Sequence, residues 1–128
     1  MIKLAERIGL PLGQLQLHQA ILEGIPQDIA MRLADEIDVP SAQIAGWLDL
    51  DQNLERMSPN CGDSLCRLID TLELLMVVME GNLSTIAKWL TTPNFALSNE
   101  QPIQLLRTEV GGHLVRRLVL AIEHGLPV

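Results

Sequence analysis

Apolar residues in this chain recur at intervals of three and four, and prolines and glycines interrupt the pattern at short distances. An interval of three or four places side chains on one face of an α-helix, whereas a half-buried strand needs alternation. The pattern therefore predicts an all-α fold. We divide the 128 residues into an N-terminal region, 1–56, and a C-terminal helical domain, 57–128, and expect the first to pack on the second.

The first predicted helix begins after Pro11-Leu12-Gly13 and runs to Leu22. Gly24 follows it, and glycine commonly ends a helix because it tolerates left-handed backbone. The residues expected to reach the core from this helix are Leu15, Ala20 and Leu22.

The second and third predicted helices are joined by a tight turn. The second begins near Pro26 and ends before Pro40, because a proline disfavours helical backbone in the residue that precedes it. Its inward face is formed by Ile29, Ala30, Leu33, Ala34 and Ile37. Ser41 is expected to cap the third helix. The apolar residues of that helix are Ile44, Ala45, Trp47 and Leu48. Two short helices joined in this way predict a helix-turn-helix-like lobe.

In a helix-turn-helix protein the second helix reads DNA with side chains such as Arg, Lys, Asn and Gln. Here that helix offers only Ser41 and Gln43 as DNA-contacting candidates. The formal charge of the chain is −7, and residues 33–55 contain six acids and no lysine or arginine. This acidic segment is either a solvated face or an electrostatic surface for a partner. It repels phosphates, so DNA binding by this chain alone is disfavoured.

A longer helix is predicted from Ser58 and Pro59, which suit the cap and the first turn, to the vicinity of Gly81. Its main apolar face consists of Leu65, Leu68, Ile69, Leu72, Leu75, Met76 and Met79. Further apolar residues lie off that face at Leu74, Val77 and Val78. They predict either core contacts on more than one side or a surface for self-association.

Two short helices and a loop are expected next. The first short helix ends before Pro93 and carries Ile86, Ala87, Trp89 and Leu90. Residues 93–101 then form a loop that Phe95 and Leu97 attach to the core. The second short helix begins at Pro102 and carries Ile103, Leu105 and Leu106.

The last predicted helix is capped by Thr108 and ends at Gly125. Its inward face is expected to contain Leu114, Val115, Leu118, Val119 and Ile122. Gly111 and Gly112, in its first turns, predict a close crossing with a neighbouring segment.

No combination of residues is typical of a catalytic site. His18, His113 and His124 lie at no recognisable metal-ligand spacing, so we expect neither a metal nor a cofactor. No phosphate-binding glycine motif is present, and we expect no enzymatic activity. Cys61 and Cys66 are expected to be thiols. The apolar runs are too short to span a membrane and the N-terminus does not resemble a signal peptide, which favours a cytoplasmic location.

The stretch from Trp89 to Gly125 has a recognisable pattern. In order, it consists of Trp89-Leu90, Pro93-Asn94, Leu97, Pro102, Leu105-Leu106, Thr108, Gly111, Val115, Leu118 and Ile122-Glu123-His124-Gly125. This pattern resembles the C-terminal toxin-binding domain of the Xre/MbcA/ParS antitoxins, and the segment from Met57 to Leu68 resembles the start of that domain. The family commonly has a glycine pair after Leu97, where this chain has Ser98-Asn99-Glu100. We expect the turn there to be made by Asn99, which tolerates left-handed backbone, or by a different path.

The resemblance implies an antitoxin of a RES–Xre type II toxin–antitoxin system. The partner would be a RES-domain toxin that consumes NAD and is inactive while the antitoxin covers its active site. The antitoxin would be a homodimer or part of a higher toxin–antitoxin complex. Co-repression of its own operon is a further role that the resemblance suggests. The residues that we predict to contact the toxin are Arg116, Arg117, Glu123, His124, Gly125, Leu126, Pro127 and Val128. Two alternatives stay open, a helix-turn-helix transcriptional regulator and an immunity or adaptor protein that binds another effector.

Overall fold

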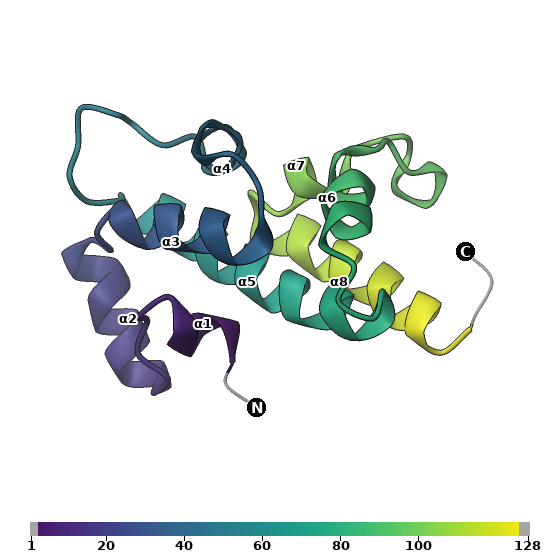
Figure 1. The fold of residues 1–128 in the computed structure, drawn as a ribbon, viewed down its shortest axis with the longest axis horizontal. Helices are drawn as coiled ribbons and strands as arrows, with labels where there is room; N and C mark the ends of the chain where they lie inside the picture. Colours follow the sequence, from purple (N-terminus) through teal and green to yellow (C-terminus); the bar gives the residue numbers. More distant parts are fainter. Residues whose placement is uncertain (1–2, 126–128) are drawn as a thin grey trace. The chain divides into compact units, whose positions relative to one another are not determined.

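A computed structural model describes residues 3–125 of the chain. The regular elements in this range are all helical, which confirms the all-α prediction. In chain order they are α1 (Leu4–Arg7), α2 (Gln14–Glu23), α3 (Asp28–Ile37), α4 (Ser41–Leu48), α5 (Pro59–Val78), α6 (Leu83–Thr91), the 3₁₀ turn η1 (Phe95–Leu97), α7 (Pro102–Leu105) and α8 (Glu109–Glu123) (Figure 1). None of the helices in residues 3–125 is long and apolar enough to cross a membrane.

The chain forms two compact units, residues 1–66 and 67–128. The boundary between them falls inside α5, between Cys66 and Arg67, so one continuous helix contributes residues to both. The N-cap predicted for α5 is present, because the Ser58 hydroxyl accepts a hydrogen bond of 3.3 Å from the backbone N–H of Cys61.

The first unit is built around α3 and α4, which pack against each other. The stripe predicted for α3 is confirmed, since all five of its residues are buried. Asp38 ends the helix in left-handed backbone with a φ of 57°, and Pro40 follows two residues later. The prediction that Ser41 caps α4 is wrong. The cap position belongs to Pro40, whose backbone is extended, and Ser41 is already the first helical residue.

The predicted core face of α2 is also wrong. The helix has the predicted position and its Gly24 terminus, but none of its residues is buried. Leu15 is 65% exposed and Leu22 is 61% exposed. The helix approaches α5 through Ile21 instead, because a Cβ placed on Gly62 would lie 3.3 Å from the Ile21 side chain. Ala20 next to Ile21 is half-buried, whereas Leu15 and Leu22 occupy a different face.

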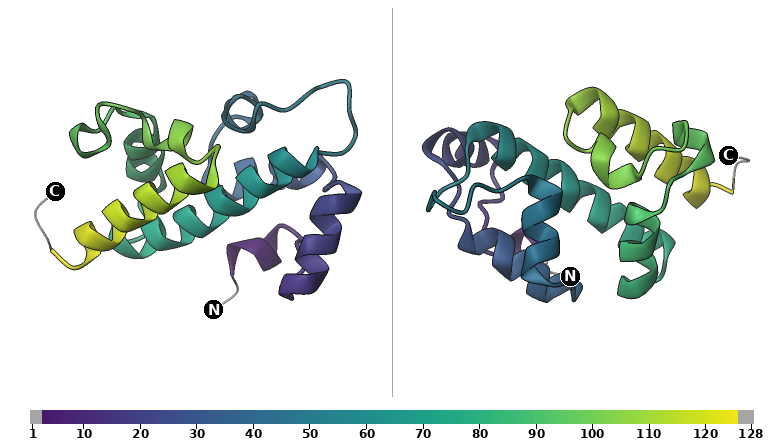
Figure 2. Two further views of the ribbon diagram at one scale, coloured as in Figure 1. Left: turned by 180° about the vertical axis from the view of Figure 1, so that it is seen from behind. Right: turned by 90° about the horizontal axis from the view of Figure 1, so that it is seen from above.

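The second unit has its core between the second half of α5 and the helices that follow. Figure 2 shows α8 alongside that half of α5, and α7 contacts both α6 and α8. The fully buried side chains of this core include Leu72, Leu75, Ile86, Leu90, Val115 and Val119. Of the face predicted for α5, Met76 and Met79 are only half-buried, and Val77, off that face, is 66% exposed.

Candidate functional site

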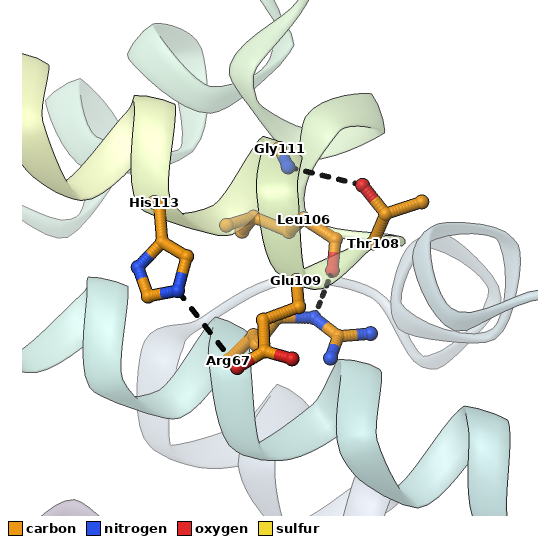
Figure 3. Close-up of polar contacts among 6 residues, drawn as sticks. All are labelled: Arg67, Leu106, Thr108, Glu109, Gly111 and His113. Atoms are coloured by element: carbon orange, nitrogen blue, oxygen red, sulfur yellow. Dashed lines mark hydrogen bonds and ion pairs between the residues drawn. The ribbon is translucent and has the colours of Figure 1, made fainter.

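The start of α8 is fixed by two close approaches and a cap. The Thr108 hydroxyl accepts a hydrogen bond of 3.0 Å from the N–H of Gly111, as predicted (Figure 3). A Cβ placed on Gly111 would collide with the backbone carbonyl of Leu105, and a Cβ on Gly112 would lie 2.9 Å from Cδ of Arg67. The predicted close crossing at the two glycines is therefore confirmed, and it places α8 directly against the turn after α7 and against α5.

Arg67, on α5, donates hydrogen bonds to the turn between α7 and α8. Its Nε donates to the carbonyl of Leu106 at 2.7 Å (Figure 3). One of its terminal nitrogens donates to the carbonyl of Arg107 at 3.0 Å. A guanidinium presents its donors in a rigid fork, so one side chain satisfies two neighbouring carbonyls at the end of α7. No local sequence pattern signals this role, because Arg67 is separated from its acceptors by about forty residues.

The exposed surface of α8 has two flanks. Residues spaced four and three apart, Val110, Leu114 and Arg117, share one flank, and Val110 is 73% exposed. The other flank contains Arg116 and the exposed ion pair of His113 with Glu109, whose Nε2 and Oε1 atoms are 3.8 Å apart (Figure 3). Neighbouring helical residues point about 100° apart. Arg116 and Arg117 are both exposed, but they lie on different flanks of α8.

The other predicted toxin contacts lie at the end of the same helix. Glu123, His124 and Gly125 are exposed, and Gly125 ends the helix with a φ of 70°. Leu126, Pro127 and Val128 lie outside the described residues. The inward face is as predicted at Val115, Leu118 and Val119, whereas Leu114 is 42% exposed. Ile122 is half-buried.

The loop between α6 and α7 presents a residue whose role was predicted wrongly. Leu97 is buried, but Phe95 is 88% exposed and does not attach the loop to the core. The loop is held by its backbone and by Asn94, whose side chain caps η1 by accepting a hydrogen bond of 2.9 Å from the N–H of Ala96. The turn predicted at Asn99 is confirmed, because Asn99 is left-handed with a φ of 65°, next to a left-handed Ser98.

The two DNA-contacting candidates of the first unit lie at the start of α4. Ser41 is exposed and Gln43 is half-buried. Among the neighbouring acids, Glu36 forms an ion pair with Arg7 at 3.4 Å, with both side chains partly exposed. Exposed pairs of this kind contribute little to stability.

Cys61 and Cys66 are thiols, as predicted, and the Sγ of Cys61 lies 3.4 Å from the carbonyl oxygen of Leu48. Within residues 3–125, no group of three or more His, Cys, Asp or Glu side chains is placed to hold a metal ion. The exposed side chains of the second unit include apolar ones, such as Phe95 and Val110, and basic ones, such as Arg116 and Arg117.

Comparison with known protein families gives a match within the second unit. Residues 72–125 match the family model described as the antitoxin Xre/MbcA/ParS C-terminal toxin-binding domain. This match over residues 72–125 confirms the resemblance that the sequence pattern predicted. The match begins at Leu72, so residues 57–71 lie outside it. No curated protein matches the chain.

The matched pattern describes the scaffold of the domain. Leu90, Leu97, Leu106, Val115 and Leu118 are buried. Asn94 and Thr108 are helix caps, and Gly111 and Gly125 provide backbone that a side chain would obstruct or strain. Trp89, Leu105 and Ile122 are half-buried. Among the exposed side chains, Phe95, Val110, Arg116 and Arg117 are outside the pattern, whereas Glu123 and His124 belong to it.

Proposed function

We propose that this protein is an antitoxin that neutralises a RES-domain, NAD-consuming toxin by covering its active site. The observation that supports it is the family match, which spans α5 from Leu72 onward and every element through α8. The domain's exposed apolar and basic side chains suit a protein partner. The complex would form in the cytoplasm, where such a toxin has access to NAD.

We propose that contact with the toxin is made by the exposed end of α8 and the residues after it. Arg116 and Arg117 would pair with acidic groups of the toxin, because a guanidinium forms two parallel hydrogen bonds to a carboxylate. Glu123, His124 and Gly125 are exposed where the helix ends. The apolar tail, Leu126, Pro127 and Val128, would enter the active-site cleft.

The experiment that tests the toxin partner is co-expression with the product of the adjacent reading frame, followed by purification through a tag on this chain. We expect a RES-domain protein to co-purify. If the co-purified product is a different effector, the result would favour the immunity or adaptor function over the antitoxin function. If nothing co-purifies, the result would favour a transcriptional regulator.

We propose that the antitoxin is a homodimer, alone or within a larger toxin complex, and that α2 is its contact face. Leu15 and Leu22 lie seven residues apart on one face of α2, and both are more than half exposed, as is Leu12 just before the helix. Glu23 is the only acid on α2 of the sixteen in the chain, so two copies can meet there with little charge repulsion.

Light scattering after size exclusion is expected to give twice the 14.2 kDa of one chain. The double substitution Leu15→Gln and Leu22→Gln is expected to halve that mass, because it removes the apolar area that drives association. Leu54→Gln changes a leucine that is 50% exposed outside α2 and is expected to leave the mass unchanged. A wild-type mass of one chain would contradict the dimer, and an unchanged mass for the double variant would contradict this face.

The helix-turn-helix-like pair, α3 and α4, supports a second function, regulation of transcription. Mobility-shift measurements at low and moderate salt, with and without the toxin, distinguish regulation of transcription from neutralisation of a toxin. We expect no tight complex between operator DNA and the isolated chain, because α4 lacks basic residues and the segment from 33 to 55 is acidic. Tight binding by the chain alone would favour the regulator.

A further inference from the structure

We infer that Phe95 is an aromatic anchor of the toxin-binding surface and inserts into an apolar pocket of the toxin. The inference rests on the proposed function, because the toxin is the occupant to which the family match points. Phe95 lies inside the matched segment, residues 72–125, on the turn η1. That turn packs against α8, the helix that carries the other predicted contacts.

The exposure of Phe95 sets it apart from the other aromatic side chains. It is the only phenylalanine in the chain, which has two tryptophans and no tyrosine. Trp47 is 8% exposed and Trp89 is half-buried, whereas Phe95 is 88% exposed. The chain thus leaves in water a large apolar side chain whose burial is strongly favourable. A partner that covers Phe95 would recover that burial energy.

The backbone around Phe95 is held in one conformation by hydrogen bonds inside the loop. The N–H of Asn94 donates to the carbonyl of Glu100 at 3.1 Å, and the N–H of Asn99 donates to the carbonyl of Asn94 at 2.9 Å. These bonds close the loop on both sides of η1, and the buried side chain of Leu97 attaches it to the core. Because the loop is already ordered, binding loses little conformational entropy.

The surroundings of Phe95 suit an interface centre. From Trp89 to Leu106 the chain contains a single charged residue, Glu100. The exposed residues of the loop around Phe95 are Thr92, Pro93, Ala96, Ser98, Asn99 and Glu100, and only Glu100 is charged. Interface hot spots are typically aromatic residues surrounded by near-neutral contacts that exclude water, and charged residues are depleted there. The complementary site on the toxin is therefore an apolar pocket with a polar rim that is uncharged except where it faces Glu100.

The test is the affinity of purified Phe95 variants for the toxin obtained by co-expression, measured by calorimetry. We expect Phe95→Ala to raise the dissociation constant at least tenfold and Phe95→Leu to raise it less, because leucine keeps part of the apolar volume. Val77→Ala is the matched control, since it truncates an exposed apolar side chain on α5 of the same unit. It is expected to change the dissociation constant by less than about twofold.

The thermal midpoints of all variants are expected to equal that of the wild type, because Phe95 contributes little to the core at 88% exposure. Tight binding by Phe95→Ala would overturn the anchor while leaving the toxin partner intact. Failure of the wild-type chain to bind the toxin would instead refute the proposed function. If Phe95→Ala binds the toxin normally but no longer self-associates, the occupant is a second copy of the chain and the inference is wrong.

Discussion

Gly111→Ala is expected to destabilise the toxin-binding domain by about 3 kcal/mol and to lower its thermal midpoint by more than about 10 °C. The new Cβ would collide with the carbonyl oxygen of Leu105 and would lie 2.8 Å from its carbonyl carbon. These are backbone atoms, so no side-chain rotation relieves the overlap. The start of α8 would have to move away, which would weaken the Thr108 cap and the Arg67 hydrogen bonds to the same turn.

Gly46→Ala is the matched control, because it introduces the same methyl group into a helix interior. Gly46 lies in α4, and a Cβ there would meet nothing within 4 Å. Alanine is favoured over glycine in helices, so this variant is expected to be more stable than the wild type by about 0.5–1 kcal/mol. Thermal and urea unfolding measure both variants. A Gly111→Ala protein as stable as the wild type would show that α8 does not need the close approach.

Deletion of residues 125–128 is expected to abolish neutralisation of the toxin without unfolding the antitoxin. The backbone hydrogen bond from His124 to Leu120, at 3.0 Å, is unaffected by the deletion, so α8 keeps its last turn.

Replacing both Arg116 and Arg117 by alanine is expected to weaken binding less, by about tenfold, because exposed charges at an interface act mainly on the association rate. Growth of cells that express the toxin together with each variant measures neutralisation.

Lys88→Ala is the control for the charge removed with the two arginines, since Lys88 is an exposed base on α6 that no proposed contact uses. It is expected to neutralise the toxin fully. If the chain without residues 125–128 also neutralises fully, the tail does not occlude the active site, and contact must come from other parts of the domain.

The parts of the fold that the sequence predicted are those determined by local rules. The buried stripe of α3 follows from helical spacing, and the cap at Thr108 follows from residue type and position. Gly111 was predicted to mark a close approach, which the carbonyl of Leu105 makes. Asn99 was predicted to be left-handed in place of the usual glycine, and it is.

The wrong predictions concern which apolar face meets a partner within the chain. Spacing shows that Leu15 and Leu22 share a face of α2, but α2 approaches α5 through Ile21, whose side chain would lie 3.3 Å from a Cβ placed on Gly62. Phe95 was assigned to the core because it is apolar, yet η1 is only three residues long and turns Leu97 inward instead. Short turns have no periodicity from which burial can be derived. Arg67 was missed because its acceptors are distant in sequence.

The candidate site was predicted at the level of elements. The exposure of Arg116, Arg117, Glu123 and His124 follows from their positions opposite the buried stripe of α8. Their contact with a toxin stays a prediction, because the matched pattern contains mostly buried or capping residues and describes the scaffold that carries them.

The central claim, neutralisation of an NAD-consuming toxin by occlusion, is tested most directly by titrating the purified chain into the toxin while NAD consumption is followed. Occlusion predicts that the initial rate falls to zero at a fixed molar ratio, and that excess NAD slows the onset of inhibition because NAD and the antitoxin compete for one cleft. Full NAD consumption in the presence of excess, bound antitoxin would contradict the account.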